Sequence, residues 1–386
     1  MAWFGHSGSQ APQLMQASVM TMAMAVVLRA KIAVDMDDNR TASWVHLGNW
    51  FRGELAGQGP HDEALLAAAR GANGWFTAEE VRHAFAALGT WCTAEVLQAW
   101  LERTPGLPVA PEGARRVGLV LAGNLPLVGF ADVAAVVCAG HRAQVKCSTG
   151  DAVLMRAAIA AWKAGGLADD AVEFVDGIVS NWDAVIATGS TNTNRYFMHY
   201  FGHIPHLLRG TRTAVAILDG AESEDDLAGL AADVFRYFGM GCRSVSKVFV
   251  PQGYDLDRLF RAFLPWSHLG DHNKYANNYT YHKAVWLLNG EQLLENGFVL
   301  LREGNGWGSP VGALTYAYHA GVDDAWQQCS AHQEHIQCVV TRSGEAVGGL
   351  PTVRMGTAQT PLPWDYADGV DTLQFLAGLA VPSDHA

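Results

Sequence analysis

Hydrophobic positions follow one spacing near the amino end of the chain and another beyond residue 115. In WFTAEEVRHAFAALGTW, 75–91, four large apolar residues recur at helical spacing: Val81, Phe85, Leu88 and Trp91. Such a stripe is typical of a helix that packs one face against a core. Thr77, followed three residues later by Glu80, has the pattern of a capping box. With a second helical segment at 93–105, the spacing predicts a helical region over 40–105.

Short continuous apolar runs replace this pattern after a Pro- and Gly-bearing linker at 104–114,. The expected strands are 116–123, 143–149, 171–175, 182–190 and 213–220. Helical segments alternate with them, at 131–140, at 151–166 and from about 192. Buried strands that alternate with helices predict a mostly parallel sheet covered on both faces. We therefore expect residues 115–236 to form an open nucleotide-binding type of domain.

The same pattern continues more loosely from residue 237 onward. A strand, a turn and a helix fit 247–263, and further strands fit 284–290, 298–304 and 337–341. A second α/β domain is therefore expected to follow the first.

Length, composition and charge narrow the class of protein. The chain has 386 residues, which exceeds one ordinary core and indicates two or three domains,. Its net charge of -12 disfavours nucleic-acid binding, which needs clustered Lys and Arg,. The apolar run 14–28 is shorter than the roughly 20 residues of a membrane span and has no clear cleavage site,. We expect a cytoplasmic protein without a membrane span, in which residues 1–40 form a disordered or extended start.

One cysteine stands in an unusual setting. Cys242 lies in GMGCRS, 239–244, between glycines and small polar residues, just ahead of an apolar strand. That setting leaves the sulfur reachable and places Arg243 beside it. A neighbouring cation can lower the pKa of a thiol and make the thiolate a nucleophile.

The other five cysteines have plainer interpretations. The chain has no CxxC pair, so free thiols are expected rather than disulfides,. Cys138 and Cys147 lie in apolar segments and are expected in the core. Cys329 and Cys338 flank two His residues, but their spacing fits no familiar zinc pattern, so no metal is expected,.

Three polar positions follow expected strands. Asn124, in GNLPL, can donate its amide to a developing oxyanion or can simply complete a turn. Lys146 stands at a strand end, where ligands bind in open α/β sheets, or it is solvated there. ATGST, 187–191, ends a strand and begins a helix whose free N–H groups, with Ser190, can bind a phosphate or be a plain N-cap. Both interpretations stay open for each on local grounds.

Taken in order, these elements resemble the aldehyde dehydrogenase superfamily. GNLPLVG looks like its Trp-Asn-Phe-Pro-Leu turn, AGHRAQVKCS like its Gly-Asn-x-x-Val-x-Lys-Pro-Ser strand, DAVIATGST like its Phe-Thr-Gly-Ser turn, and FGMGCRSVSKVFVP like its Gly-Gln-x-Cys segment. Over roughly residues 70–380 the resemblance is closer to one branch, the acyl-CoA reductases related to the fatty-acid reductase of bacterial bioluminescence. WFTAEEVRHAF, FRYFGMGCRSVSKVFVP, HNKYANNYTYHKA and WDYADGVDTLQFL carry it.

The resemblance implies an α/β fold of the aldehyde dehydrogenase type, with an open, mostly parallel sheet and a second α/β domain. Its parts would be a helical region at 41–114, a nicotinamide-cofactor domain at 115–236, a cysteine-bearing catalytic domain at 237–350, and a C-terminal segment at 351–386. That last segment would return to the cofactor domain or to an oligomer interface. The polar segment 267–284 would line the acyl-CoA entrance, or it is a surface loop.

The resemblance also implies roles for individual residues. Cys242 would be the nucleophile, and Asn124 with the Cys242 backbone N–H would form the oxyanion hole. The residues that would hold the ribose and phosphates of the cofactor are Lys146, Ser148, Thr188, Gly189 and Ser190. The substrate would be an acyl-CoA, and the chain would work as a homo-oligomer, with an acyl-transferring protein as a further partner.

Three departures from the superfamily pattern refine this expectation. The stretch 207–218, where hydrolytic members carry a Glu base, has no carboxylate before Asp219, which favours reduction,. Thr149 stands near the place where NAD-preferring relatives have a ribose-binding Glu, which favours NADPH, with NADH as the alternative. NGWGSPVG, 305–312, lacks the Glu that contacts the nicotinamide ribose, so that contact has no assigned residue.

The sequence therefore predicts NADPH-dependent reduction of a long-chain acyl-CoA to an aldehyde through an S-acyl intermediate on Cys242. Two alternatives remain at this stage. One is an aldehyde dehydrogenase that works in the oxidative direction. The other is a subunit of low turnover that accepts acyl groups from a transferase partner.

Overall fold

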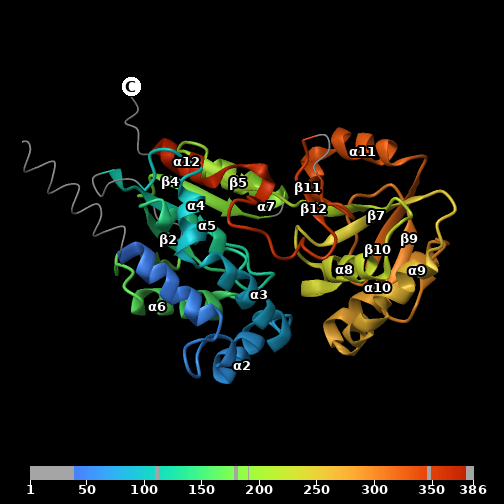
Figure 1. Cartoon of the computed structure of the whole chain (residues 1–386), viewed down its shortest axis with the longest axis horizontal. Coiled ribbons are helices and arrows are strands. Elements are labelled where there is room, and N and C mark those ends of the chain that lie inside the picture. The colour runs from blue at the N-terminus through green and yellow to red at the C-terminus, as the bar shows by residue number, and fades with distance from the viewer. Residues whose placement is uncertain (1–38, 109–112, 178–180, 190, 346–348, 380–386) are drawn as a thin grey trace, which may run out of the picture.

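The computed structural model describes residues 39–108, 113–177, 181–189, 191–345 and 349–379 (Figure 1). Residues 1–38, most of the expected amino-terminal extension, lie outside the described residues. The described chain forms one parallel and one mostly parallel sheet, with helices on their faces and a group of helices at the amino end.

The amino-terminal helices pack on the first sheet. They are a helix over 39–51, α2 (Glu63–Ala72), α3 (Ala78–Trp91) and α4 (Ala94–Leu101). The apolar stripe of α3 is buried as predicted, and it shares one core with large rings further along the chain, among them Phe130 and Trp162. Only one of the two hydrogen bonds of the predicted capping box at Thr77 is present. The Thr77 hydroxyl accepts the Glu80 N–H at 3.3 Å, but the Glu80 carboxylate bonds elsewhere.

In the described chain the first sheet has five parallel strands in the order β3-β2-β1-β4-β5. The strands are β1 (Arg116–Val120), β2 (Arg142–Lys146), β3 (Val172–Phe174), β4 (Ala184–Thr188) and β5 (His206–Arg209). The helices are α5 (Phe130–Cys138), α6 (Ala152–Ala164) and α7 (Thr191–Phe201). Successive strand residues point to opposite faces. Ile186 of β4 accordingly joins the core under α5 and α6, whereas Val185 and Ala187 pack against α7. The predicted two-sided parallel sheet is confirmed.

In the described chain the second sheet has seven strands in the order β12-β11-β6-β7-β10-β9-β8, parallel except for the β8–β9 pair. The strands are β6 (Thr213–Ile217), β7 (Val245–Pro251), β8 (Leu294–Glu295), β9 (Leu300–Glu303), β10 (Ala313–His319), β11 (Ile336–Thr341) and β12 (Thr352–Arg354). The helices are α8 (Glu224–Phe235), α9 (Asp257–Phe263), α10 (Asn273–Leu288) and α11 (Val322–Ala331). Leu227 and Leu259 cover one face, and Ala325 and Trp326 cover the other.

The last helix returns to the first sheet. In Figure 1, α12 (Thr372–Leu379) lies beside the first sheet, although β11 and β12, which precede it in the chain, belong to the second. Leu373 and Leu376 of α12 are buried in the same core as α5.

Two strand assignments from the sequence are wrong. The run 213–220 was expected in the first sheet, within the 115–236 domain, but β6 pairs with β7 and β11 of the second sheet. The run 284–290 was expected as a strand, but it ends α10, with Trp286 buried and Leu287 and Leu288 exposed. The polar segment 267–284 consists of the end of a 3₁₀ helix, Leu264–Asp271, and of the first three turns of α10.

Candidate active site

A cavity of about 470 Å³ lies where the two sheets meet. The carboxyl ends of strands in the first sheet contribute Asn124, Gly189 and Arg209, and the segment before β7 contributes Cys242. Much of the remaining wall is apolar. It comes from α3, α5 and the segment 359–368, with Ala84, Ala87, Leu88, Trp91, Ala131, Ala135, Pro361 and Leu362 among its residues.

Cys242 occupies the tip of a tight turn on this cavity. The N–H of Ser244 donates to the carbonyl of Gly241 at 3.0 Å, and the Gly241 N–H donates to the Ser244 hydroxyl at 3.1 Å. This turn presents Cys242 outward. Among the six cysteines, all of which the structure describes and none of which is in a disulfide, Cys242 alone is exposed. The exposed position of Cys242 agrees with the setting expected from its glycine and small polar neighbours.

The electrostatic expectation for this thiol needs correction. The protein atoms that surround the cavity wall desolvate the thiolate and raise the pKa of Cys242, although the residue is exposed to the cavity,. The Arg243 and Arg209 guanidinium groups act in the opposite direction, and Asp368 adds to the rise. Arg243 is itself buried and donates from Nε to the Ala358 carbonyl at 2.6 Å. A nearby cation is therefore present, but desolvation affects the pKa of Cys242 more strongly than the cation does.

Asn124 lies beside the cysteine loop. Its Nδ2 donates to the carbonyl oxygen of Met240 at 3.1 Å. An amide nitrogen carries two hydrogens, so one remains for a ligand. The turn that carries Asn124 includes Leu127 at φ 55°, whose N–H donates to the buried carboxylate of Asp151 at 3.0 Å. Asn124 therefore lines the cavity and joins the turn after β1 to the cysteine loop.

The expected cofactor residues fall into two groups. Thr188 and Gly189 line the same cavity as Cys242. Lys146 is the last residue of β2 and pairs with Val120 of β1, Ser148 lies two residues further on, and Ser190 lies outside the described residues. A Cβ atom on Gly123 would clash with the Ser148 hydroxyl. The turn after β1 and the segment after β2 are therefore so close together that only glycine fits at position 123.

Two ion pairs in the cavity wall were missed by sequence reasoning. Arg209 Nη2 donates to Asp132 at 2.7 Å and to the Thr372 hydroxyl at 2.8 Å, and both charged side chains are less than one-tenth exposed. Burial raises the pKa of Asp132, and Arg209 opposes this rise. Arg212 pairs with Asp368 at 3.3 Å, and Asp368 also accepts the Gly210 N–H at 3.2 Å. The available signal was Asp132 itself, because a lone acid in an apolar helix needs a buried partner.

Searches for a metal centre and for a membrane span found neither in the described residues. No group of three or more His, Cys, Asp or Glu side chains there could hold a metal ion. Cys329 and Cys338 are buried, whereas His332 and His335 are exposed. None of the described helices is both long enough and apolar enough to cross a bilayer.

No family model matches the chain, and no curated protein matches it. Among solved structures, an oxidoreductase from Marinobacter aquaeolei aligns with a TM-score of 0.63 at 14% identity, over 88% of this chain and 84% of that one. An indole-3-acetaldehyde dehydrogenase in complex with NAD+ aligns with a TM-score of 0.59 at 12% identity, over 79% and 72%. An NAD-dependent aldehyde dehydrogenase from Sinorhizobium meliloti gives 0.59 at 15%, over 79% and 70%. At such identities the likeness shows the fold, which is that of the aldehyde dehydrogenases, as expected.

Proposed function

We propose that the chain is an oxidoreductase of the aldehyde dehydrogenase type that reduces a long-chain fatty acyl-CoA to the aldehyde with NADPH. The observation that carries this proposal is the exposed Cys242 at the tip of a turn, on a largely apolar cavity beside the Asn124 amide. Such a cavity suits an acyl chain, and a reachable thiol suits attack on a thioester.

The reaction would begin with loss of the Cys242 thiol proton to solvent. The thiolate attacks the thioester carbonyl carbon, and the oxygen takes the negative charge beside the free N–H of Asn124. The intermediate collapses, the carbon–sulfur bond to CoA breaks, and the CoA thiolate leaves with a proton from solvent. The acyl group then remains as a thioester on Cys242 until it is reduced and released as the aldehyde, which returns the thiolate.

The strand ends of the first sheet fit a nicotinamide dinucleotide. Lys146 and Ser148 would hold the ribose, and Thr188 and Gly189, at the start of α7, would face the phosphates,. When bound, the cofactor supplies the hydride. The close approach of Gly123 to Ser148 supports a tight backbone platform there. Thr149 is exposed and adds no carboxylate that would repel a 2′-phosphate, which favours NADPH.

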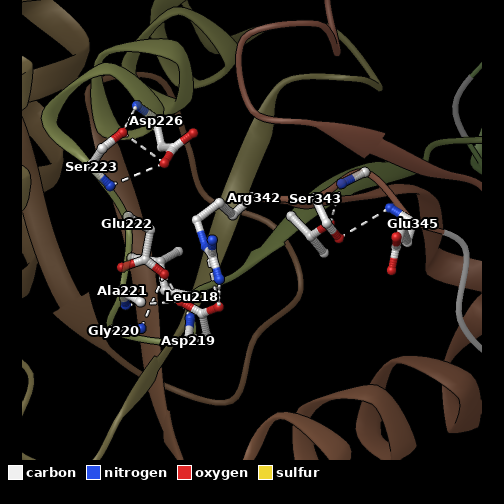
Figure 2. Close-up of polar contacts among 12 residues, drawn as sticks. Leu218, Asp219, Gly220, Ala221, Glu222, Ser223, Asp226, Arg342, Ser343 and Glu345 are labelled. Carbon is white, nitrogen blue, oxygen red and sulfur yellow. Dashed lines mark hydrogen bonds and ion pairs between the residues drawn. The ribbon is translucent and has the colours of Figure 1, made fainter.

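The missing base supports reduction over hydrolysis. Asp219 is the first carboxylate after β5, and its Oδ2 accepts a hydrogen bond from Arg342 Nη2 at 2.7 Å. Figure 2 shows this pair. That pair lies beyond the carboxyl end of β6, whereas Arg212, which lines the cavity, lies just before the strand begins. At about 3.3 Å per residue, Asp219 is therefore about 20 Å from Arg212 along the strand direction. The carboxylates that do line the cavity are engaged: Asp132 with Arg209, Asp368 with Arg212 and Asp365 with the Leu362 N–H.

The test is NADPH oxidation with tetradecanoyl-CoA by the parent, Cys242→Ala and the matched variant Cys147→Ala. We expect activity in the parent and in Cys147→Ala, and none in Cys242→Ala. Activity that survives in Cys242→Ala would contradict the covalent route. NAD-dependent acid formation from tetradecanal would favour the oxidative alternative, and labelling of Cys242 by acyl-CoA without turnover would favour an acyl-accepting subunit.

A further inference from the structure

The Glu80 carboxylate reaches from α3 to the loop that carries Cys242. Its Oε2 accepts the backbone N–H of Tyr237 at 3.0 Å, and its Oε1 accepts Arg236 Nη1 at 3.3 Å. Glu80 is only 3% exposed. A carboxylate that is buried so fully needs partners, and both of its partners belong to the segment just before the cysteine.

Tyr237 needs this acceptor because of its backbone conformation. Tyr237 and Phe238 have φ values of 55° and 58°, in the left-handed region, directly after α8 ends. A residue other than glycine is disfavoured in this region, because its Cβ atom lies too close to the following carbonyl oxygen. Two in succession persist only where the surroundings hold them, and such strain gathers at functional sites. Glu80 supplies an oxygen acceptor for the backbone N–H of the first of the two residues.

The loop leads from this strained pair to the reactive groups. Four residues separate Tyr237 from Cys242, and the Met240 carbonyl between them accepts a hydrogen bond from the Asn124 amide. The direction that the chain takes at Tyr237 therefore determines where the sulfur and the Asn124 contact lie.

We propose that Glu80 is a positioning residue for Cys242, which holds the left-handed Tyr237 so that the sulfur faces the cavity beside Asn124. The proposal rests on the role of Cys242 as nucleophile in the proposed function. The same helix also touches the cavity. Ala84, Ala87 and Leu88 of α3 line it, and the His83 ring stacks on Tyr237, with centroids 5.6 Å apart. One helix thus contacts the space for the acyl chain and orients the thiol.

The chain offers a matched control for this role. Glu79 also pairs with Arg236, at 2.8 Å, but it is mostly exposed and makes no bond to Tyr237. Glu79→Gln removes a carboxylate from Arg236 and leaves the loop held. Glu80→Ala removes the acceptor. Glu80→Gln keeps an oxygen acceptor of the same length, and Glu80→Asp keeps the charge but withdraws the acceptor by about one carbon–carbon bond, ~1.5 Å.

The experiment measures two quantities on the full chain. The first is the iodoacetamide alkylation rate of Cys242, followed by peptide mass spectrometry, which needs no substrate. The second is kcat and KM with tetradecanoyl-CoA. For Glu80→Ala and Glu80→Asp we expect an alkylation rate at least about threefold different from the parent and a kcat lower by about 100-fold, with KM little changed. Glu80→Gln and Glu79→Gln are expected to behave like the parent.

The outcomes separate this proposal from the proposed function. A parental alkylation rate in Glu80→Ala would overturn the positioning role, whatever the enzyme does with acyl-CoA. If Glu80→Ala does not fold, Glu80→Asp decides on the same criterion. The parent chain could lack reductase activity while Glu80→Ala still changes the alkylation rate of Cys242 relative to the parent. That result would support the positioning role and contradict the substrate assignment. Equal losses in Glu80→Gln and Glu80→Ala would point to the charge rather than the Tyr237 bond, and would overturn the proposal.

Discussion

Asn124 and Met240 are joined by a hydrogen bond of 3.1 Å from the side-chain amide to the backbone carbonyl. Asn124 follows the first strand of one sheet, and Met240 belongs to the loop that enters a central strand of the other. The bond therefore fixes the distance between the expected oxyanion donor and the expected nucleophile, on two separately folded sheets.

Loss of the Asn124 amide should slow the chemical step. We expect Asn124→Ala to lower kcat with tetradecanoyl-CoA by about 100–1000-fold, the loss typical of one oxyanion donor. Asn124→Asp, which has the same shape but no N–H donor, should lose as much. Steady-state kinetics measures both, and Cys242 alkylation checks that the thiol is still reachable. An Asn124→Ala enzyme within threefold of the parent kcat would remove Asn124 from the mechanism.

The Arg209–Asp132 pair should be coupled strongly in stability. Both side chains are nearly buried, so removal of one partner leaves an uncompensated charge. We expect Arg209→Met or Asp132→Leu to lower the free energy of unfolding by about 3–5 kcal/mol. The double variant Arg209→Met/Asp132→Leu should recover most of that loss, because an apolar pair needs no solvation. Urea unfolding of the single and double variants measures this coupling, and strictly additive losses would contradict it.

The first sheet could be predicted because its signals are local. Its apolar runs are short, and helices lie between them, so parallel strands with two covered faces follow. The gathering of Asn124, Thr188 and Gly189 follows too, because the carboxyl ends of parallel strands share one edge. The domain boundary could not be predicted. β5 and β6 are separated by Gly210–Arg212 only, and no local property of β6 reveals which sheet will pair with it.

The parts of the site that sequence reasoning missed depend on contacts between distant residues. Glu80 fits a capping box, but its carboxylate finds a partner 157 positions away, at Tyr237. Arg209 and Asp132 are 77 positions apart. The net rise in the Cys242 pKa is also a property of the folded cavity, because neighbouring residues in sequence reveal Arg243 but not the desolvation that outweighs it.

The apolar wall on α3 should limit the length of the acyl chain. Ala87 is half-buried and lines the cavity, whereas Ala86 beside it is exposed on the other side of the helix. Ala87→Leu places added volume where the chain would lie. We expect its kcat/KM for tetradecanoyl-CoA to fall by about 10–200-fold, with a smaller fall for octanoyl-CoA, in line with the energy of one or more methylenes. Ala86→Leu is the control, and equal losses for both chain lengths would contradict the placement.

The buried Asp151 should make stability depend on pH. Burial raises its pKa to about 8, and the Leu127 N–H opposes this rise. Between about pH 4 and pH 8 the folded chain therefore holds a proton that the unfolded carboxyl has lost. The contribution of Asp151 to stability is greatest below pH 4, and it falls by up to about 1.4 kcal/mol per pH unit as the pH rises to 8.

Asp151→Asn keeps an acceptor for the Leu127 N–H and removes the titration, so the stability of this variant relative to the parent should increase from pH 5 to pH 8. Urea midpoints at four pH values measure this, with the exposed Asp169→Asn as control. A constant difference between parent and Asp151→Asn would show that Asp151 ionises normally in the folded protein.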